Sequence, residues 1–184
     1  QDVCADMYPY TAGSTNLYAM LPDWAQEGTT DSLMSRLEDP ALRKRMCEEM
    51  GSETLYSHLD WDEVLVTEAP AHREWEGQKI AALAAADGRD PYMWILDALR
   101  SDQLSVQIAM FMMSEANIEM QLRKPYMMIG SDAWALSTSG ALSTGKPHPR
   151  CYGTFPRLLG EYVRNRRVIS LEEAIRKATG APAE

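Results

Sequence analysis

An aspartate at the end of an apolar run is the residue of this sequence whose position best suits chemistry. Residues 126–130 predict a buried strand, and Ser131 and Asp132 follow it directly. A carboxylate at the carboxyl end of a strand is where barrel enzymes place metal ligands and general bases. A lone Ser-Asp pair after a strand is more often a helix cap or a turn. Judged by its own position, Asp132 therefore has two interpretations, and the structural one is favoured.

The histidines and cysteines give no second site by themselves. His148 lies between two prolines and is expected to form structural hydrogen bonds, whereas His58 and His72 lie among charged residues and are expected to face solvent. A disulfide framework and a zinc finger are both unsupported, because the cysteines are odd in number, widely spaced and without a Cys-x-x-Cys pair. The cysteines are Cys4, Cys47 and Cys151.

The composition is that of a globular protein with an acidic balance. The 184 residues are 45% hydrophobic and carry a formal net charge of -9. This charge argues against a nucleic acid as partner, because nucleic-acid binders gather Lys and Arg on one face. No stretch is long enough to span a bilayer, and the sequence starts at Gln1 without an initiator Met or a signal region. We therefore expect a soluble protein without a membrane partner, whose true start is missing. The cysteine usage favours a reducing, cytoplasmic setting.

Apolar spacing and turn residues predict alternating strands and helices that would position these groups. Asp31 is expected to cap one helix, Asp90 with Pro91 to start another, and Ser170 with Glu173 to form a capping box. The methionine-rich stretches within two of the strands are assigned to the core. The expected strands are 2–9, 63–67, 106–113 and 126–130, and helices are expected around 33–37 and 42–46, over 77–88, from 91, from 115, over 155–163 and over 171–178. Strands interleaved with amphipathic helices indicate an α/β protein with a largely parallel sheet.

A set of motifs in fixed order resembles those of one enzyme family. The motifs are Gly130-Ser131-Asp132, His148-Pro149-Arg150 and the Gly-Thr-Phe-Pro-Arg segment 153–157. They resemble the Gly-Ser-Asp, His-Pro-Arg and Gly-Thr-Phe-Pro-Arg series of the N-acyl-D-amino-acid deacylases, in the amidohydrolase superfamily. Residues 6–15 are similar to the Asp-x-Tyr-Pro-Tyr segment of that family, and residues 170–179 to its last barrel helix. The resemblance covers essentially the whole chain.

The resemblance implies the C-terminal part of a metal-dependent (β/α)8 barrel with a largely helical insertion. Residues 1–20 would form a barrel strand and a substrate loop, 21–113 the insertion, and 114–184 the last barrel strand and the C-terminal helices. The implied reaction is zinc-dependent hydrolysis of the amide bond of N-acyl-D-amino acids, in which a metal-bound hydroxide attacks the acyl carbonyl. Asp132 would bind the zinc, accept the water proton and pass it to the leaving amine.

By the same matching, Tyr8, Ser14 and Arg150 would hold the carboxylate of a small-molecule N-acyl-amino-acid substrate. Arginine offers a planar bidentate fork, and the two hydroxyls donate from the side. Without the resemblance, each residue has a structural interpretation: Tyr8 as core filling, Ser14 as a turn residue and Arg150 as a surface ion-pair former.

The sequence also departs from the family pattern. The first-strand His-x-His, the bridging Cys or Lys and two later histidines would all precede Gln1, so we expect the isolated chain to be inactive. Ala133 stands where Gly is usual, and the loop before His148 is longer than expected. Two alternatives stay open. A cyclic-amide hydrolase of the same superfamily, similar to dihydroorotase or hydantoinase, would share Asp132 without needing the carboxylate site, and a non-catalytic α/β module would bind another protein. The sequence does not indicate an oligomeric state.

Overall fold

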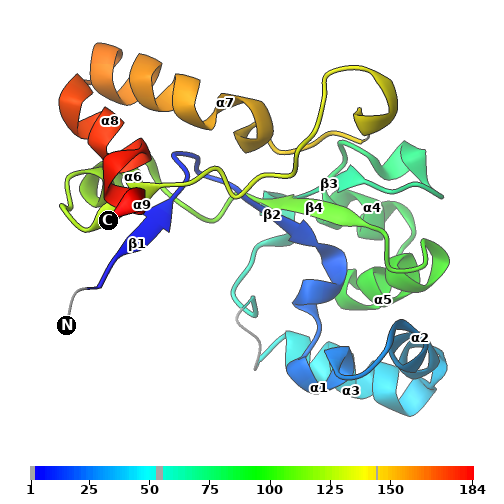
Figure 1. Cartoon of the computed structure of the whole chain (residues 1–184). Helices are drawn as coiled ribbons and strands as arrows, with labels where there is room; N and C mark the ends of the chain where they lie inside the picture. Colours follow the sequence, from blue (N-terminus) through cyan, green and yellow to red (C-terminus); the bar gives the residue numbers. More distant parts are fainter. Residues whose placement is uncertain (1–2, 53–55, 144) are drawn as a thin grey trace. The chain divides into compact units, whose positions relative to one another are not determined.

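The computed structural model describes residues 3–52, 56–143 and 145–184, and its secondary structure is mixed α/β, as the sequence predicts (Figure 1). The chain divides into two compact units. The terminal unit takes its described residues from 1–13, 112–143 and 147–184, and the central unit takes its residues from 14–111 and 144–146. Each unit has a hydrophobic core of its own.

Two parallel strands position the start of the chain beside its later part in the terminal unit. Strand β1 (Ala5–Met7) pairs with β5 (Met127–Ile129), and the N–H of Gly130 donates to the carbonyl oxygen of Met7 at 3.1 Å. Because the strands are parallel, both carboxyl ends lie at the same edge of this small sheet. Tyr8 follows the first strand and Asp132 follows the second, as the sequence predicts. The strands are less buried than expected, since Met127 and Met128 are only half-buried.

Helices on the sequence-predicted segments complete the terminal unit. Ser114 caps α6 (Glu115–Leu122) and Ser170 caps α8 (Leu171–Ala178), each through a side-chain oxygen that accepts a backbone N–H at 3.2 Å. The helix expected from 155 begins earlier, because α7 already starts at Arg150. The remaining elements are the π-helical segment η5 (Leu158–Asn165), the 3₁₀ turn η4 (Gly140–Leu142) and the last short helix α9 (Gly180–Ala183). In Figure 1 the ribbon of α7 continues without a break into η5.

The central unit packs helices and a small sheet around an apolar core. Leu37, Met46, Ile95, Leu99 and Ile108 are fully buried in it. The helices are α1 (Asp23–Gln26), α2 (Thr30–Glu38), α3 (Pro40–Met50), α4 (Ile80–Ala86) and α5 (Pro91–Ser101); the strands are β2 (Gly13–Asn16), β3 (Val64–Glu68) and β4 (Gln107–Met110); and the 3₁₀ turns are η1 (Leu17–Met20), η2 (Trp61–Glu63) and η3 (Arg73–Trp75).

Helix starts in the central unit follow the sequence rules, with one correction. Asp90 caps α5 with Pro91 in its first turn, and Asp39 caps α3. The expectation that Asp31 caps α2 is wrong. Thr29 is the cap, since its hydroxyl accepts the N–H of Ser32 at 3.3 Å, and Asp31 lies in the first turn. An acidic residue in the first turn still interacts favourably with the helix dipole, so Asp31 stabilises the start of α2 without capping it.

The expectation of a largely parallel sheet is wrong for the central unit. Its strand order is β2-β4-β3, and β3 and β4 are antiparallel, with Val64 opposite Met110. Apolar spacing is the same in both orientations, so it does not encode strand direction. The chain reverses after α5 through Gln103 and Leu104, which both have positive φ values of 49° and 63°. β4 ends at Met110, and Met112 and Met113 are exposed, so their assignment to the core is also wrong.

No helix among the described residues is long and apolar enough to cross a membrane.

Candidate functional site

Arg150 is the residue around which the candidate site is built. It opens α7 in the terminal unit, and its side chain is only 8% exposed. Its Nη2 lies 3.2 Å from Oδ2 of Asp132, and its guanidinium carbon lies 4.6 Å above the centroid of the Tyr8 ring. Two parallel strand ends and one helix start thus converge on a buried cation. The interpretation of Arg150 as a surface ion-pair former is wrong in one respect, because the arginine is buried.

Asp132 lies in an irregular segment beyond β5 rather than at a helix start. Its φ is +46°, in a region that Asp and Asn tolerate better than most residues. Helix capping therefore does not explain this aspartate, since the residues that follow it are not helical. Its side chain is 71% exposed while one of its oxygens faces Arg150. The carboxylate is accessible to a ligand and is already oriented by a cation.

His148 forms structural hydrogen bonds, as predicted, and these bonds hold the arrangement in place. The side chain is buried, its Nδ1 accepts the backbone N–H of Arg150 at 3.0 Å, and Nε2 lies 2.9 Å from the carbonyl oxygen of Ala12. Because Nδ1 accepts, Nε2 carries the hydrogen and donates it to Ala12. Burial, followed by the charge of Arg150, lowers the pKa of His148 below its ordinary value. Both ring nitrogens are engaged, which leaves none for a metal.

The aromatic residues on either side of Pro9 enclose His148. Its ring centroid lies 5.9 Å from that of Tyr8 and 5.2 Å from that of Tyr10, and both pairs pack edge to face. Tyr10 also packs against α7 so closely that a Cβ on Gly153 would lie 2.3 Å from its hydroxyl oxygen. No role for Tyr10 was predicted from the sequence, although the Tyr-Pro-Tyr pattern and Gly153 both lie in motifs that resemble those of the deacylases.

Ser14 belongs to the central unit, where it is half-buried within strand β2. The interpretation of Ser14 as a turn residue is therefore wrong. Tyr8, Asp132 and Arg150 come together within the terminal unit. The role of Ser14 in substrate binding stays a prediction.

The terminal unit can supply one ligand of a metal site. No group of three or more His, Cys, Asp or Glu side chains among residues 3–52, 56–143 and 145–184 is arranged to hold a metal ion. Zinc accepts carboxylate oxygen, and protein sites supply three or four ligands. The exposed carboxylate of Asp132 is suited to be one of them. The others would have to come from outside the described residues.

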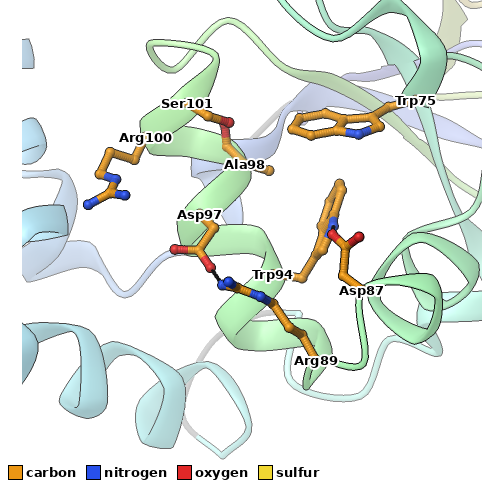
Figure 2. A pocket seen from close by; sticks show the side chains of 8 residues that line it. All are labelled: Trp75, Asp87, Arg89, Trp94, Asp97, Ala98, Arg100 and Ser101. Carbon is orange, nitrogen blue, oxygen red and sulfur yellow. Dashed lines mark hydrogen bonds and ion pairs between the residues drawn. The ribbon is translucent and has the colours of Figure 1, made fainter.

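A surface pocket in the central unit contains none of the predicted site residues. It has a volume of about 430 Å³ and is drawn in Figure 2. Asp97 is ion-paired with Arg89, and Trp94 Nε1 donates to Oδ2 of Asp87 at 3.1 Å. Two pairs of lining residues thus engage each other's polar groups, and the pocket does not compete with the Arg150 site. The lining residues are Trp75, Asp87, Arg89, Trp94, Asp97, Ala98, Arg100 and Ser101.

Proteins of known activity are similar to this chain along its sequence. A D-aminoacylase of Alcaligenes xylosoxydans xylosoxydans is 31% identical over 183 residues, which is 100% of this chain and 28% of the relative. An N-acyl-D-glutamate deacylase of the same organism is 32% identical over 124 residues, which is 66% of this chain and 22% of the relative. The chain thus spans about a quarter of the length of these relatives. No family model matches the chain.

Solved structures of deacylases have folds similar to that of this chain. The N-acyl-D-glutamate deacylase of Bordetella bronchiseptica, complexed with zinc and with a phosphonate inhibitor that mimics the tetrahedral reaction intermediate, has a TM-score of 0.62 and 27% identity. The similarity covers 98% of this chain and 28% of that one. A D-aminoacylase with a binuclear metal centre has a TM-score of 0.60 and 30% identity, over 100% of this chain and 28% of its own.

Proposed function

We propose that the protein containing this chain hydrolyses the amide bond of N-acyl-D-amino acids with the help of zinc. The similarity of the chain to D-aminoacylases, over about 28% of their length, supports the proposal. One observation carries the proposal: the exposed carboxylate of Asp132 and the buried guanidinium of Arg150 lie 3.2 Å apart. A group suited to metal binding and proton transfer thus lies next to a group suited to binding a carboxylate.

In the proposed fold, β1 and β5 are neighbouring strands of a (β/α)8 barrel. Their parallel pairing supports this, because barrel strands are parallel and active sites lie at their carboxyl ends. We assign residues 1–20 to a barrel strand and substrate loop, 21–113 to a mostly helical insertion, and 114–184 to the last barrel strand and C-terminal helices. The separate core of the central unit supports the insertion.

Asp132 performs two tasks in the proposed reaction. It is a zinc ligand, and it accepts the proton of the attacking water and returns it to the leaving amine, a role that suits a carboxylate within reach of the reacting atoms. When bound, zinc lowers the pKa of water to about 7 and polarises the amide carbonyl. The ion pair with the neighbouring Arg150 orients the carboxylate of Asp132.

Arg150 binds the substrate's carboxylate in this proposal. Its partner in the structure is the carboxylate of Asp132, and a substrate carboxylate offers the same two acceptor oxygens to the same planar fork. Tyr8, on which the guanidinium lies, and Ser14 donate their hydroxyls to the same group. A buried arginine selects an anion strongly, because an unpaired buried charge is costly.

The substrate panel that tests the function uses the longer protein containing this chain. Hydrolysis should be rapid for N-acetyl-D-amino acids and slow for their L enantiomers and for dihydroorotate. Preference for dihydroorotate would instead identify a cyclic-amide hydrolase. No turnover of any of these compounds by zinc-loaded protein would favour a non-catalytic α/β module that binds another protein.

The free state of Cys4, Cys47 and Cys151 supports a cytoplasmic setting.

A further inference from the structure

The aromatic segment 8–12 is held against both ends of α7. At the start of the helix, Arg150 lies over the ring of Tyr8. At its last residue, Nε of Arg157 donates to the carbonyl oxygen of Pro9 at 2.7 Å, and the Arg157 guanidinium carbon lies 5.1 Å from the ring centroid of Tyr10. The two ends of the helix therefore contact the segment at Tyr8 and at Pro9 with Tyr10, and only the contact of Arg150 is explained by substrate binding.

Arg157 is itself oriented by an acidic residue on another helix. Its Nη2 donates to Oε1 of Glu115, in the first turn of α6, at 2.7 Å, and the hydroxyl of Tyr162 donates to Oε2 of the same carboxylate at 2.8 Å. Burial and the bond to Glu115 raise the pKa of Tyr162 to about 12, so this hydroxyl keeps its proton at neutral pH. Arg157 thus connects Pro9 with Glu115, because its Nε binds the carbonyl oxygen of Pro9 and its Nη2 binds the carboxylate of Glu115.

The helix register brings Arg157 and Tyr162 to the same carboxylate. In an α-helix, residues five positions apart point about 140° away from each other. Here the chain passes into the π-helical segment η5 directly after Arg157, and the wider turn of a π-helix places residues five apart on one face. Pro156, which has no N–H to donate, lies just before this change. The π-helical segment therefore lets both side chains reach Glu115.

We propose that Arg157 is a positioning residue for substrate binding: by holding the Pro9 carbonyl it fixes Tyr8 against Arg150. This inference rests on the proposed function, because it assigns to Tyr8 and Arg150 the substrate's carboxylate. The described contacts of Arg157 reach Pro9 and Tyr10 on one side and Glu115 and Tyr162 on the other, so its effect should fall on substrate binding and leave the bond-breaking step nearly unchanged. A lysine would reach one of its two partners but not span both.

Steady-state kinetics of Arg157→Gln in the longer protein test this role. We expect KM for an N-acetyl-D-amino acid to rise by about tenfold, the effect of losing one charge-assisted hydrogen bond, while kcat changes much less. Arg157→Lys should recover part of the loss. The matched control is Arg166→Gln, since Arg166 pairs with the same Glu115 and with Glu119 and Glu161 but has no bond to Pro9. A KM rise of equal size in the control would overturn the positioning role.

Amide hydrogen exchange gives a readout that does not depend on activity. The N–H of Tyr10 is bonded to the carbonyl oxygen of Tyr8, and that of Arg150 to His148. Both should exchange faster in Arg157→Gln and remain unchanged in Arg166→Gln. Unchanged exchange of the Tyr10 amide in Arg157→Gln would overturn the inference whatever the kinetics show.

A double variant separates this inference from the proposed function. If Arg157 acts through Tyr8, then Arg157→Gln added to Tyr8→Phe should raise KM by much less than it does in the unsubstituted protein. A full additional rise would show that Arg157 acts elsewhere. Lack of deacylase activity in the unsubstituted protein would overturn the proposed function before any substitution is made, so the two failures are distinguishable.

Discussion

Arg150 and Asp132 form an ion pair in which the arginine is 8% exposed and the aspartate 71% exposed, with 3.2 Å between Nη2 and Oδ2. The partners therefore differ in what they can do. The buried cation has little freedom and favours a fixed anionic partner, whereas the exposed carboxylate can exchange its partner for a metal ion or a proton. This difference predicts distinct consequences for substitution at the two positions.

Replacing the carboxylate should affect turnover most. Asp132→Asn keeps the shape of the side chain but removes its charge and its basicity. In the longer protein, kcat on an N-acetyl-D-amino acid should fall by about 10² to 10⁴, the range that a lost proton-transfer group accounts for, while KM changes less. Steady-state kinetics at saturating zinc measure both quantities. A fall confined to KM would contradict the role of Asp132 in proton transfer.

Replacing the arginine should instead affect binding. Arg150→Lys keeps the charge but loses the bidentate fork, so KM should rise and kcat should change less. An N-acyl amine without a carboxylate provides the control, because it should be a poor substrate of the unsubstituted protein and should be insensitive to the substitution. If that amine is cleaved as well as the acid, Arg150 does not bind the substrate carboxylate.

Zinc affinity distinguishes the chain from the longer protein. The described residues supply one suitable carboxylate, Asp132, where protein zinc sites use three or four ligands. The isolated chain should therefore bind zinc more weakly than micromolar and show no deacylase turnover, as measured by titration calorimetry and by a product assay. Tight binding that Asp132→Asn abolishes would show that the chain carries a metal site of its own.

Acid should weaken the packing around His148. Its pKa is lowered in the folded state from the ordinary value of 6.5, mainly by burial. As the pH falls below about 6.5, the unfolded state takes up a proton that the folded state does not, and the free energy of unfolding decreases. Thermal unfolding of the chain between pH 8 and pH 5 should show this decrease. A variant with His148→Gln should show a smaller decrease, whereas the exposed His58→Gln should behave like the unsubstituted chain.

The central unit should fold without the terminal unit. Its core is built from its own buried residues, among them Leu37, Ile95 and Ile108. A fragment of residues 14–111 should therefore unfold in one cooperative, concentration-independent transition, which denaturant titration and sedimentation can check. Leu99→Ala, at a fully buried position, should lower its stability by about 2 to 5 kcal/mol. Gradual, concentration-dependent melting would contradict the independent folding of this unit.

The sequence by itself determined the local elements, because the signals for them are local. The side chains of Asp39, Asp90 and Ser170 cap helices at the positions where the chain places them, since each cap bonds an N–H only two or three residues ahead. It also determined the similarity to the deacylases, because the motifs around Asp132 and Arg150 are contiguous in the chain.

Only the tertiary structure decided strand direction and the construction of the site. The antiparallel pairing of β3 and β4 could not be predicted, because apolar spacing is the same in both directions. The contact between Tyr8 and Arg150 joins residues 142 positions apart, 8 to 150, and depends on the pairing of β1 with β5. The bond from Arg157 to Pro9 depends on that pairing and on where α7 packs. Long-range packing energies, which no local pattern contains, determine such contacts.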